Sequence, residues 1–305
     1  MQGKKLPCGN RPDNIALLPL QTPLPAPYAN EVSVKMGNFP AVKEVCNVRK
    51  SGFQHSTPSS RPAAGLALAV ETSGRVGSVA VGAGEKILAE KKFSGPMCHS
   101  AEIFPSISRL LQDIGHQPDE IARLYISIGP GSFTGLRIAV ALAKAWHLAR
   151  RVELVAVDTL DAIAANIADY ADHAGVEIRN AAAVLDAKRG QFFVAAYRLH
   201  ANKTTGRYHK VLDDCLMRPA EFLERFVDKN EPIYLAGEGL LYYQSAFESP
   251  GIEFVPQQYW CPRAAKVYRL GFEKALRGVF ADPLTLQPAY IRRPEAEEKW
   301  KNNRK

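Results

Sequence analysis

The sequence predicts an α/β protein built from two similar units, and three observations support this fold class. Short apolar runs alternate with helical patterns from about residue 65 onward. An order of three strands, a helix, a strand and a helix occurs twice along the chain. Each copy also places an acid, Glu71 or Asp186, at the end of its first strand. We therefore expect a first lobe at 65–175 and a second lobe with a C-terminal tail at 176–305.

The first unit should begin with three strands joined by short turns, followed by alternating helices and buried strands. Its apolar pattern predicts strands at 66–71, 76–81, 87–93, 124–128 and 154–157, and helices at 100–114, 134–149 and from Asp158 or Thr159 onward. Asp158 and Thr159 are both residue types that cap a helix start.

The second unit repeats this order. Strands are predicted at 181–185, 191–199, 210–217 and 233–236, and helices at 219–227, after Gly237-Glu238-Gly239, and at 263–278. The tail that follows is punctuated by Pro283, Pro288 and Pro294.

Residues 1–64 differ from the remainder of the chain. They are rich in Pro, Ser, Asn and Lys and show no sustained helical or strand period, so a disordered N-terminal extension is predicted. An organelle transit peptide or a start codon assigned too far upstream would explain the segment equally well. Eight Lys or Arg stand against three acids within residues 1–62, and they supply much of the formal net charge of +8.

Composition bounds the class of protein. The five cysteines are far apart and form no Cys-x-x-Cys pair, which fits a reducing cytoplasm better than a disulfide framework. No apolar stretch approaches the roughly 20 residues that a transmembrane helix needs, so no membrane contact is expected. The basic residues form no aromatic-studded stripe along the sequence, and charge alone does not establish nucleic-acid binding.

The glycine-rich turn at 129–137, with the sequence GPGSFTGLR, joins a predicted strand to a predicted helix. Glycines permit close backbone approach and a helix start offers free N–H groups, so Gly131 and Ser132 are candidate phosphate contacts. Alternatively, Ser132 or Thr134 caps the helix and the glycines allow tight packing. A Walker A loop is excluded because no Lys-Ser or Lys-Thr ends the run, and a nucleophile elbow because Pro130 and Thr134 replace its glycines.

Two acids at matched positions predict a candidate nucleotide site. Glu71 is followed by Thr72 and Ser73, and Asp186 precedes a predicted hairpin in the same way. One acid from each lobe can hold a magnesium nucleotide between duplicated halves. A single acid of this kind is an ordinary strand-end turn residue, and only the matched pair favours nucleotide binding.

Two helices carry a candidate partner-binding surface. The six residues concerned are Ile103, Ile107 and Leu111 in one helix and Gly135, Ala139 and Ala143 in the next. The small residues recur every four positions, which forms a ridge that lets another helix approach closely. Packing against the chain's own sheet explains the same spacing, and the sequence does not separate the two. Because the histidines lack the spacing of a helical zinc site, no metal site and no catalytic residue is predicted.

Several blocks of the sequence resemble the TsaB (YeaZ) family of bacterial proteins. The blocks are VETS ending at Ser73, His99-Ser100 with Phe104-Pro105, GPGSFTGLR from Gly129, DAKRGQ from Asp186, PRA from Pro262 and AYIRRPEAEEKW from Ala289. The resemblance runs from about Gly65 to the C-terminus and implies a duplicated, two-lobed fold like that of actin and the sugar kinases, which is ribonuclease H-like. Glu71 stands where an aspartate is usual in the family, which weakens the case for a magnesium role of its loop.

The resemblance also implies a function in forming N6-threonylcarbamoyladenosine at position 37 of tRNAs that read codons starting with A. In that system a TsaB-like chain is a non-catalytic subunit that pairs with a TsaD-like catalytic subunit, and a TsaE-like ATPase joins them. A second copy of the chain is another expected partner, and tRNA is reached through the complex. The chain itself would require no cofactor, whereas ATP or ADP with magnesium would belong to the complex.

Two other functions are compatible with parts of the sequence. Glu71, Asp186 and the loop at 237–239 also fit a stand-alone actin-fold ATP-binding enzyme of the kinase type. The spacing of Gly129, Gly131 and Gly135 is close to that of a Rossmann oxidoreductase, although that motif should follow the first strand of a domain.

Overall fold

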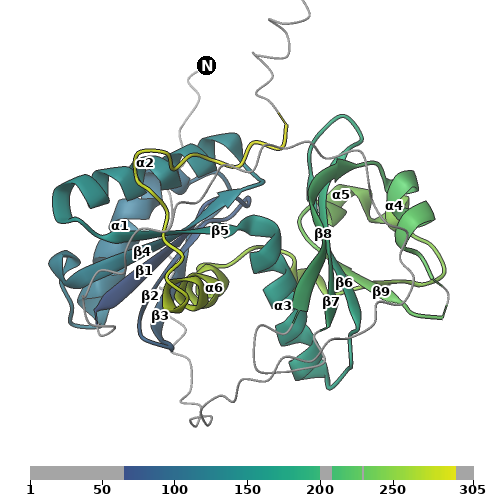
Figure 1. Ribbon diagram of the computed structural model, residues 1–305, viewed down its shortest axis with the longest axis horizontal. Coiled ribbons are helices and arrows are strands. Elements are labelled where there is room, and N and C mark those ends of the chain that lie inside the picture. Colours follow the sequence, from purple (N-terminus) through teal and green to yellow (C-terminus); the bar gives the residue numbers. More distant parts are fainter. Residues whose placement is uncertain (1–64, 200–207, 229, 293–305) are drawn as a thin grey trace, which may run out of the picture.

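A computed structural model describes residues 65–199, 208–228 and 230–292, which form two lobes side by side (Figure 1). The extension predicted at 1–64 lies outside the described residues, as does the end of the tail beyond Arg292. Each lobe contains one five-stranded mixed sheet covered by helices.

The first sheet has the order β3-β2-β1-β4-β5. Its strands are β1 (Leu66–Glu71), β2 (Ser78–Ala83), β3 (Lys86–Lys92), β4 (Ile121–Gly129) and β5 (Glu153–Asp158). Strand β1 is central and buried along its whole length, antiparallel to β2 and parallel to β4. Burial on both faces explains why β1 reads as a continuous apolar run and not as an alternating one.

The second sheet repeats this order as β8-β7-β6-β9-β10. Its strands are β6 (Asn180–Asp186), β7 (Phe192–Leu199), β8 (Tyr208–Met217), β9 (Ile233–Ala236) and β10 (Ile252–Phe254). The repeated topology confirms the duplicated actin-like, two-lobed α/β fold. The Rossmann hypothesis is wrong, because that fold has a mostly parallel sheet whereas β1, β2 and β3 pair antiparallel here.

The helices agree with the sequence pattern except in the second half of the second unit. They are α1 (His99–Asp113), α2 (Phe133–Arg150), α3 (Thr159–Ala174), α4 (Pro219–Phe226), α5 (Leu240–Tyr243) and α6 (Ala264–Leu276), with 3₁₀ turns at Pro118–Glu120, Gln244–Phe247 and Gln257–Tyr259. The helix predicted after the loop at 237–239 shrinks to the single turn of α5, because the chain must reach β10 by Ile252. Strand β10 was not predicted, since three residues are too few to show an alternating pattern.

Two helices are exchanged between the lobes. Helix α3 follows β5 in the chain but packs its apolar residues, such as Ile163 and Ile167, into the core of the second lobe. Helix α6 follows the second sheet but packs Val267 and Tyr268 on the first. Figure 1 shows α3 between the lobes and α6 on the face of the first sheet opposite α1 and α2. The predicted boundary near residue 175 therefore separates the strands but not the helices, which pack across it.

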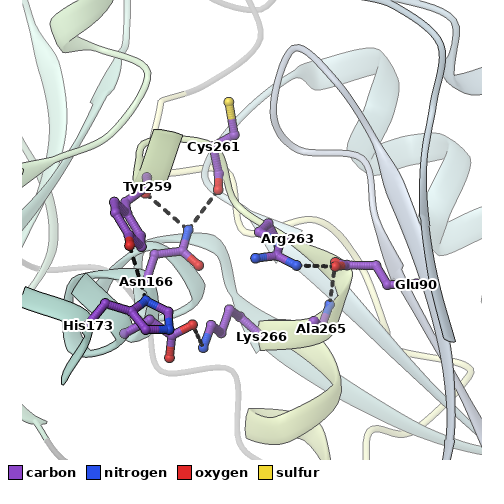
Figure 2. Close-up of polar contacts among 9 residues, drawn as sticks. Glu90, Asn166, His173, Tyr259, Cys261, Arg263, Ala265 and Lys266 are labelled. Atoms are coloured by element: carbon purple, nitrogen blue, oxygen red, sulfur yellow. Dashed lines mark hydrogen bonds and ion pairs between the residues drawn. The ribbon is translucent and has the colours of Figure 1, made fainter. Parts of the chain in front are cut away.

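Polar contacts join α3, α6 and the first sheet at this exchange (Figure 2). Asn166 of α3 donates to the carbonyl oxygens of Tyr259 and Cys261, at 3.1 Å and 2.7 Å. The guanidinium of Arg263 pairs with Glu90 of β3, whose other oxygen accepts from the backbone N–H of Ala265 at 2.9 Å. These buried and half-buried contacts hold the start of α6 against the edge of the first sheet.

No helix in the described ranges is both long and apolar enough to cross a bilayer.

The exchange predicts that a core substitution in α6 destabilises the first lobe. Tyr268 is 1% exposed and packs edge-on against Tyr125 of β4, with ring centroids 5.5 Å apart. We expect Tyr268→Ala to cost about 3–5 kcal/mol of unfolding free energy, because it leaves a large cavity. Hydrogen exchange should show the loss of protection in β1, β4 and β5. Phe104→Ala, at a side chain 64% exposed in the same lobe, is the control, and equal effects of the two changes would contradict the assignment.

Candidate functional site

The glycine-rich turn closes onto the loop that follows β1. The backbone N–H of Ser132 donates to the carbonyl oxygen of Ser73 at 2.7 Å, and the Thr72 hydroxyl donates to the carbonyl oxygen of Gly135 at 2.7 Å. The Ser132 side chain caps α2 by accepting from the N–H of Gly135 at 3.3 Å. The turn thus makes its polar contacts within the chain, in the manner of a capped and tightly packed helix start.

Two of the glycines are required by this close approach. A Cβ atom on Gly135 would lie 1.8 Å from the carbonyl oxygen of Thr72, and one on Gly131 would lie 2.5 Å from that of Ser73. Both distances are far below any real contact between a side chain and the backbone. The glycines therefore serve the packing of α2 against the loop after β1.

Glu71 is enclosed in the same cluster. Its side chain is fully buried, and one carboxylate oxygen accepts from both the backbone N–H and the hydroxyl of Ser73. The other oxygen has no hydrogen-bond partner among the described residues. Burial raises the pKa of Glu71 above its usual range, and hydrogen bonds from Ser73 offset this only in part. A carboxylate that is sealed from solvent is poorly placed to hold magnesium, which keeps several waters in its coordination shell.

The structure brings five of the six predicted nucleotide contacts together and leaves one in the other lobe. Glu71, Thr72, Ser73, Gly131 and Ser132 form the cluster described above. Asp186 lies at the end of β6, where its oxygens accept from the backbone N–H and the ammonium of Lys188, at 2.7 Å and 2.6 Å. Asp186 therefore fixes its own hairpin, as an ordinary strand-end acid does.

The loop after β1 also reaches the second lobe, a contact that sequence reasoning missed. The backbone N–H of Arg75 donates to Glu238 at 2.9 Å, and its guanidinium donates to the hydroxyl of Tyr242 at 2.6 Å. Glu238 places a carboxylate in the glycine loop at 237–239, which disfavours a phosphate there. Gly237 is needed for packing, because a Cβ atom would lie 2.0 Å from the carbonyl oxygen of Val184.

The six residues predicted to bind a partner are all buried in the protein's interior. Ile103, Ile107, Leu111, Gly135, Ala139 and Ala143 are buried, and those of α1 and α2 face the first sheet and each other. Of the two explanations that the sequence left open, the structure shows internal packing. Ile107 is 4% exposed and Leu111 is 1% exposed, so these side chains act in the packing of the two helices, and their contact with a partner stays a prediction.

The solvent side of the same helix pair exposes several apolar residues. Phe104 of α1 is 64% exposed and Leu148 of α2 is 78% exposed. The small residues Ala101, Ala141 and Ala145 are exposed as well. We call these five residues the outer α1–α2 face. Phe104 and the pair Ala141 and Ala145 are the sequence signs of this face. They are less conspicuous than the longer periodic series of buried residues on the same helices.

The C-terminal tail from Ala289 contacts both the glycine-rich turn at 129–137 and the hairpin that follows Asp186. The sequence alone does not predict these contacts. The N–H of Ala289 donates to the carbonyl oxygen of Ile128 at 2.7 Å, just before the glycine-rich turn. The Tyr290 ring packs against Phe133, and its hydroxyl accepts from Arg137 of α2 at 3.0 Å. Two residues later, the Arg292 guanidinium donates to the hairpin at 187–191 of the second lobe. The tail thus spans both lobes, as its course in Figure 1 shows.

Four histidines of the described ranges have structural contacts. His99 is buried and contacts the carbonyl oxygen of Gly74 at 3.1 Å, while His116 pairs with Glu120 at 2.8 Å. His147 and His173 bind a backbone carbonyl and a tyrosine hydroxyl. Within the described residues, no three His, Cys, Asp or Glu side chains gather in a way that could hold a metal ion.

Comparison with known proteins points to one group. Residues 95–300 match the family described as "TsaD: tRNA N6-adenosine threonylcarbamoyltransferase". The chain is 29% identical to the tRNA threonylcarbamoyladenosine biosynthesis protein TsaB of Bacillus subtilis, over 78% of this chain and 99% of that protein. It is 24% identical to the protein of the same name from Escherichia coli, over 67% and 85% of the two chains. The solved structure of YeaZ from Pseudomonas aeruginosa has the same fold, with a TM-score of 0.62 at 23% identity, covering 74% of this chain and 99% of that one.

The close approach of Gly135 yields a stability prediction. Gly135→Ala should cost about 3 kcal/mol or more of unfolding free energy, because a methyl group cannot fit against the Thr72 carbonyl without moving the backbone. Denaturant unfolding measures the change. Gly95→Ala is the matched control, since nothing lies within 4 Å of a Cβ atom there, and it should stay within about 0.5 kcal/mol. A Gly135→Ala variant as stable as the control would show that the turn is not packed in this way.

The raised pKa of Glu71 yields a pH prediction. Because the folded protein holds the proton more tightly than the unfolded chain, this group's stabilising contribution is complete at low pH and is lost as pH rises through its folded pKa. Glu71→Gln keeps the accepting oxygen and mimics the neutral acid. Its unfolding free energy relative to wild type should therefore increase with pH above about 4.5. The exposed Glu85→Gln serves as control, and a difference independent of pH would contradict the assignment.

Proposed function

We propose that this chain is the non-catalytic partner of a TsaD-like subunit. It belongs to the TsaD-related family of tRNA N6-adenosine threonylcarbamoyltransferase proteins, within the TsaB (YeaZ) branch of that family. The process is tRNA threonylcarbamoyladenosine biosynthesis, after which its curated relatives are named. The proposed product is N6-threonylcarbamoyladenosine at position 37 of tRNAs that read codons starting with A.

The exposed outer α1–α2 face carries the partner role. Two large apolar side chains, Phe104 and Leu148, are exposed on the neighbouring helices α1 and α2, and three alanines are exposed on the same two helices. Large exposed apolar side chains gathered with small residues favour close packing of a second helical surface. The buried ridge of Gly135, Ala139 and Ala143 holds α2 close to the first sheet, so the outer face is presented by a rigid support.

The closed site after β1 favours a non-catalytic role over the alternative of a kinase-like enzyme. That alternative depends on Glu71, Asp186 and the loop at 237–239. Glu71 is sealed from solvent, Asp186 is engaged by Lys188, and Glu238 places a carboxylate in the loop itself. The groups that a magnesium nucleotide would need are therefore already occupied by contacts within the chain.

The remaining members of the complex are proposed on the same basis. A TsaE-like ATPase would join the pair, ATP or ADP with magnesium would bind at the complex, and tRNA would be the substrate. A homodimer through the outer α1–α2 face would compete with the pairing to the TsaD-like subunit, because both would cover the same side chains.

Two experiments test the proposed role. Depletion of this protein in its host, followed by rescue with the cloned chain, should lower and then restore N6-threonylcarbamoyladenosine in tRNA digests. Co-expression with the host TsaD-like subunit should give a heterodimer by size-exclusion chromatography. Normal levels of the modified nucleoside after depletion would overturn the proposal. So would tight magnesium-ATP binding with turnover by the isolated chain, which would favour the kinase-like enzyme.

A charge placed on the outer α1–α2 face should break the heterodimer. We expect Phe104→Glu and Leu148→Glu each to weaken binding to the TsaD-like subunit at least tenfold, because each buries a charge at the centre of an apolar contact. Analytical ultracentrifugation or calorimetry measures the affinity. Leu276→Glu is the matched control, at a side chain 63% exposed on the end of α6, and it should leave the affinity unchanged. Wild-type affinity in both face variants would place the partner elsewhere.

A further inference from the structure

The hairpin between β6 and β7 holds two basic side chains in an unusual backbone conformation. Lys188, Arg189 and Gly190 have φ angles of 65°, 57° and 68°, so three consecutive residues are left-handed. A turn of this kind is satisfied by Gly, Asn or Asp, and other residues adopt it at a cost in stability. Only Gly190 suits the turn. The identity of Lys188 and Arg189 is therefore not explained by the needs of the backbone.

Contacts from two directions keep this hairpin in place. Asp186 accepts from the backbone N–H and the ammonium of Lys188 on one side. On the other side, Arg292 of the tail donates to the carbonyl oxygens of Ala187 and Lys188 and to the side-chain oxygen of Gln191. A strained conformation persists when its surroundings over-determine it, and such strain collects at binding sites.

The result is a rigid tip that presents positive charge. The Lys188 side chain is 81% exposed and Arg189 is exposed as well. The backbone of the tail then leads from Arg292 to Tyr290, which contacts Arg137 and Phe133 at the start of α2. The Arg137 guanidinium lies 3.8 Å from the centre of the Phe133 ring, and both side chains are exposed. Four cations thus follow the tail from one lobe to the other, and Asp186 pairs with one of them, Lys188.

We propose that this edge, comprising Lys188, Arg189, Arg292 and Arg137 with Phe133 and Tyr290, contacts the phosphate backbone of the tRNA directly. The inference rests on the proposed function, which supplies an RNA substrate. Cations bind phosphates without regard to sequence, and the exposed Phe133 ring beside the half-buried Tyr290 gives a surface on which an unpaired base can stack. The sequence alone does not reveal this arrangement, because its members come from α2, the β6–β7 hairpin and the tail.

An RNA explains these features better than an acidic protein surface does. The cations lie at two places, with Lys188, Arg189 and Arg292 at the hairpin and Arg137 at the start of α2, which suits a ligand that carries charge along its length. The backbone of the hairpin is fixed before binding, so little conformational entropy is lost when a phosphate arrives. Arg292 adds charge but is mainly a positioning residue, since its donors hold the hairpin.

The test uses asparagine, which suits the left-handed turn while removing the charge. Arg189→Asn and Lys188→Asn are each prepared in the complex with the host TsaD-like subunit, and an unmodified tRNA transcript is titrated by fluorescence anisotropy. We expect binding three- to tenfold weaker for each variant, and a slope of log affinity against log salt reduced by about 0.7–0.9. The thermal midpoint should stay the same or rise by about 2 °C, because asparagine relieves strain. Lys86→Asn, at an exposed site in β3, should change neither affinity nor slope.

Each of the other possible results would contradict a specific part of the proposal. Unchanged affinity and slope in both hairpin variants would overturn the direct contact while leaving the heterodimer intact. Weaker assembly with the TsaD-like subunit, together with unchanged tRNA binding by the assembled pair, would assign the hairpin to a protein partner and overturn the inference. If the wild-type heterodimer does not form, the proposed function fails, and the same variants titrated with tRNA as isolated chains at low salt still decide whether the hairpin binds RNA.

Discussion

The packing of α2 against the carbonyl groups of Thr72 and Ser73 is the constraint on which the rest of the structure depends. It requires glycine at positions 131 and 135, because any larger residue would overlap the backbone after β1. It buries Glu71 and positions the loop that reaches Glu238 in the second lobe. It also sets the direction of α2, and hence the surface that α1 and α2 expose. A glycine-rich turn that resembles an anion-binding site therefore joins two segments of one chain here. The sequence of such a turn does not by itself show that it binds an anion.

The exchange of α3 and α6 makes the two lobes depend on each other. Each sheet is completed by a helix that belongs, in chain order, to the other half. The lobes are therefore not independent folding units, even though their strands repeat one order. Polar groups at the crossing bond across it, Asn166 to backbone carbonyl oxygens and the Arg263 guanidinium to Glu90. The two halves thus share one strand order while neither half contains all the helices that cover its own sheet.

The sequence predicted most of the strands and the long helices because their apolar periods are strong, as in β1 and α1. It failed at α5 and β10, which are too short to show a period. The motif-bearing segments were found, since Glu71, Ser132 and Asp186 lie at element ends. What each residue does could not be predicted, because burial, the carboxylate of Glu238 and the contact of Arg292 depend on segments distant in the sequence. The helical period of apolar residues likewise marks the buried face of α1 and α2 but not the exposed one.

The tail has a mechanical consequence for the molecule as a whole. Ala289 is bonded to the end of β4 and Arg292 to the β6–β7 hairpin, with only three residues from one anchor to the other. Three residues of fully extended chain reach roughly 10 Å, so little slack remains between the lobes. The clamshell motion by which two-domain kinases open and close around a substrate would have to break one of these anchors. While both anchors hold, the tail limits how far the two lobes can separate along this edge, and so limits the range of shapes that the chain can bring to an assembly.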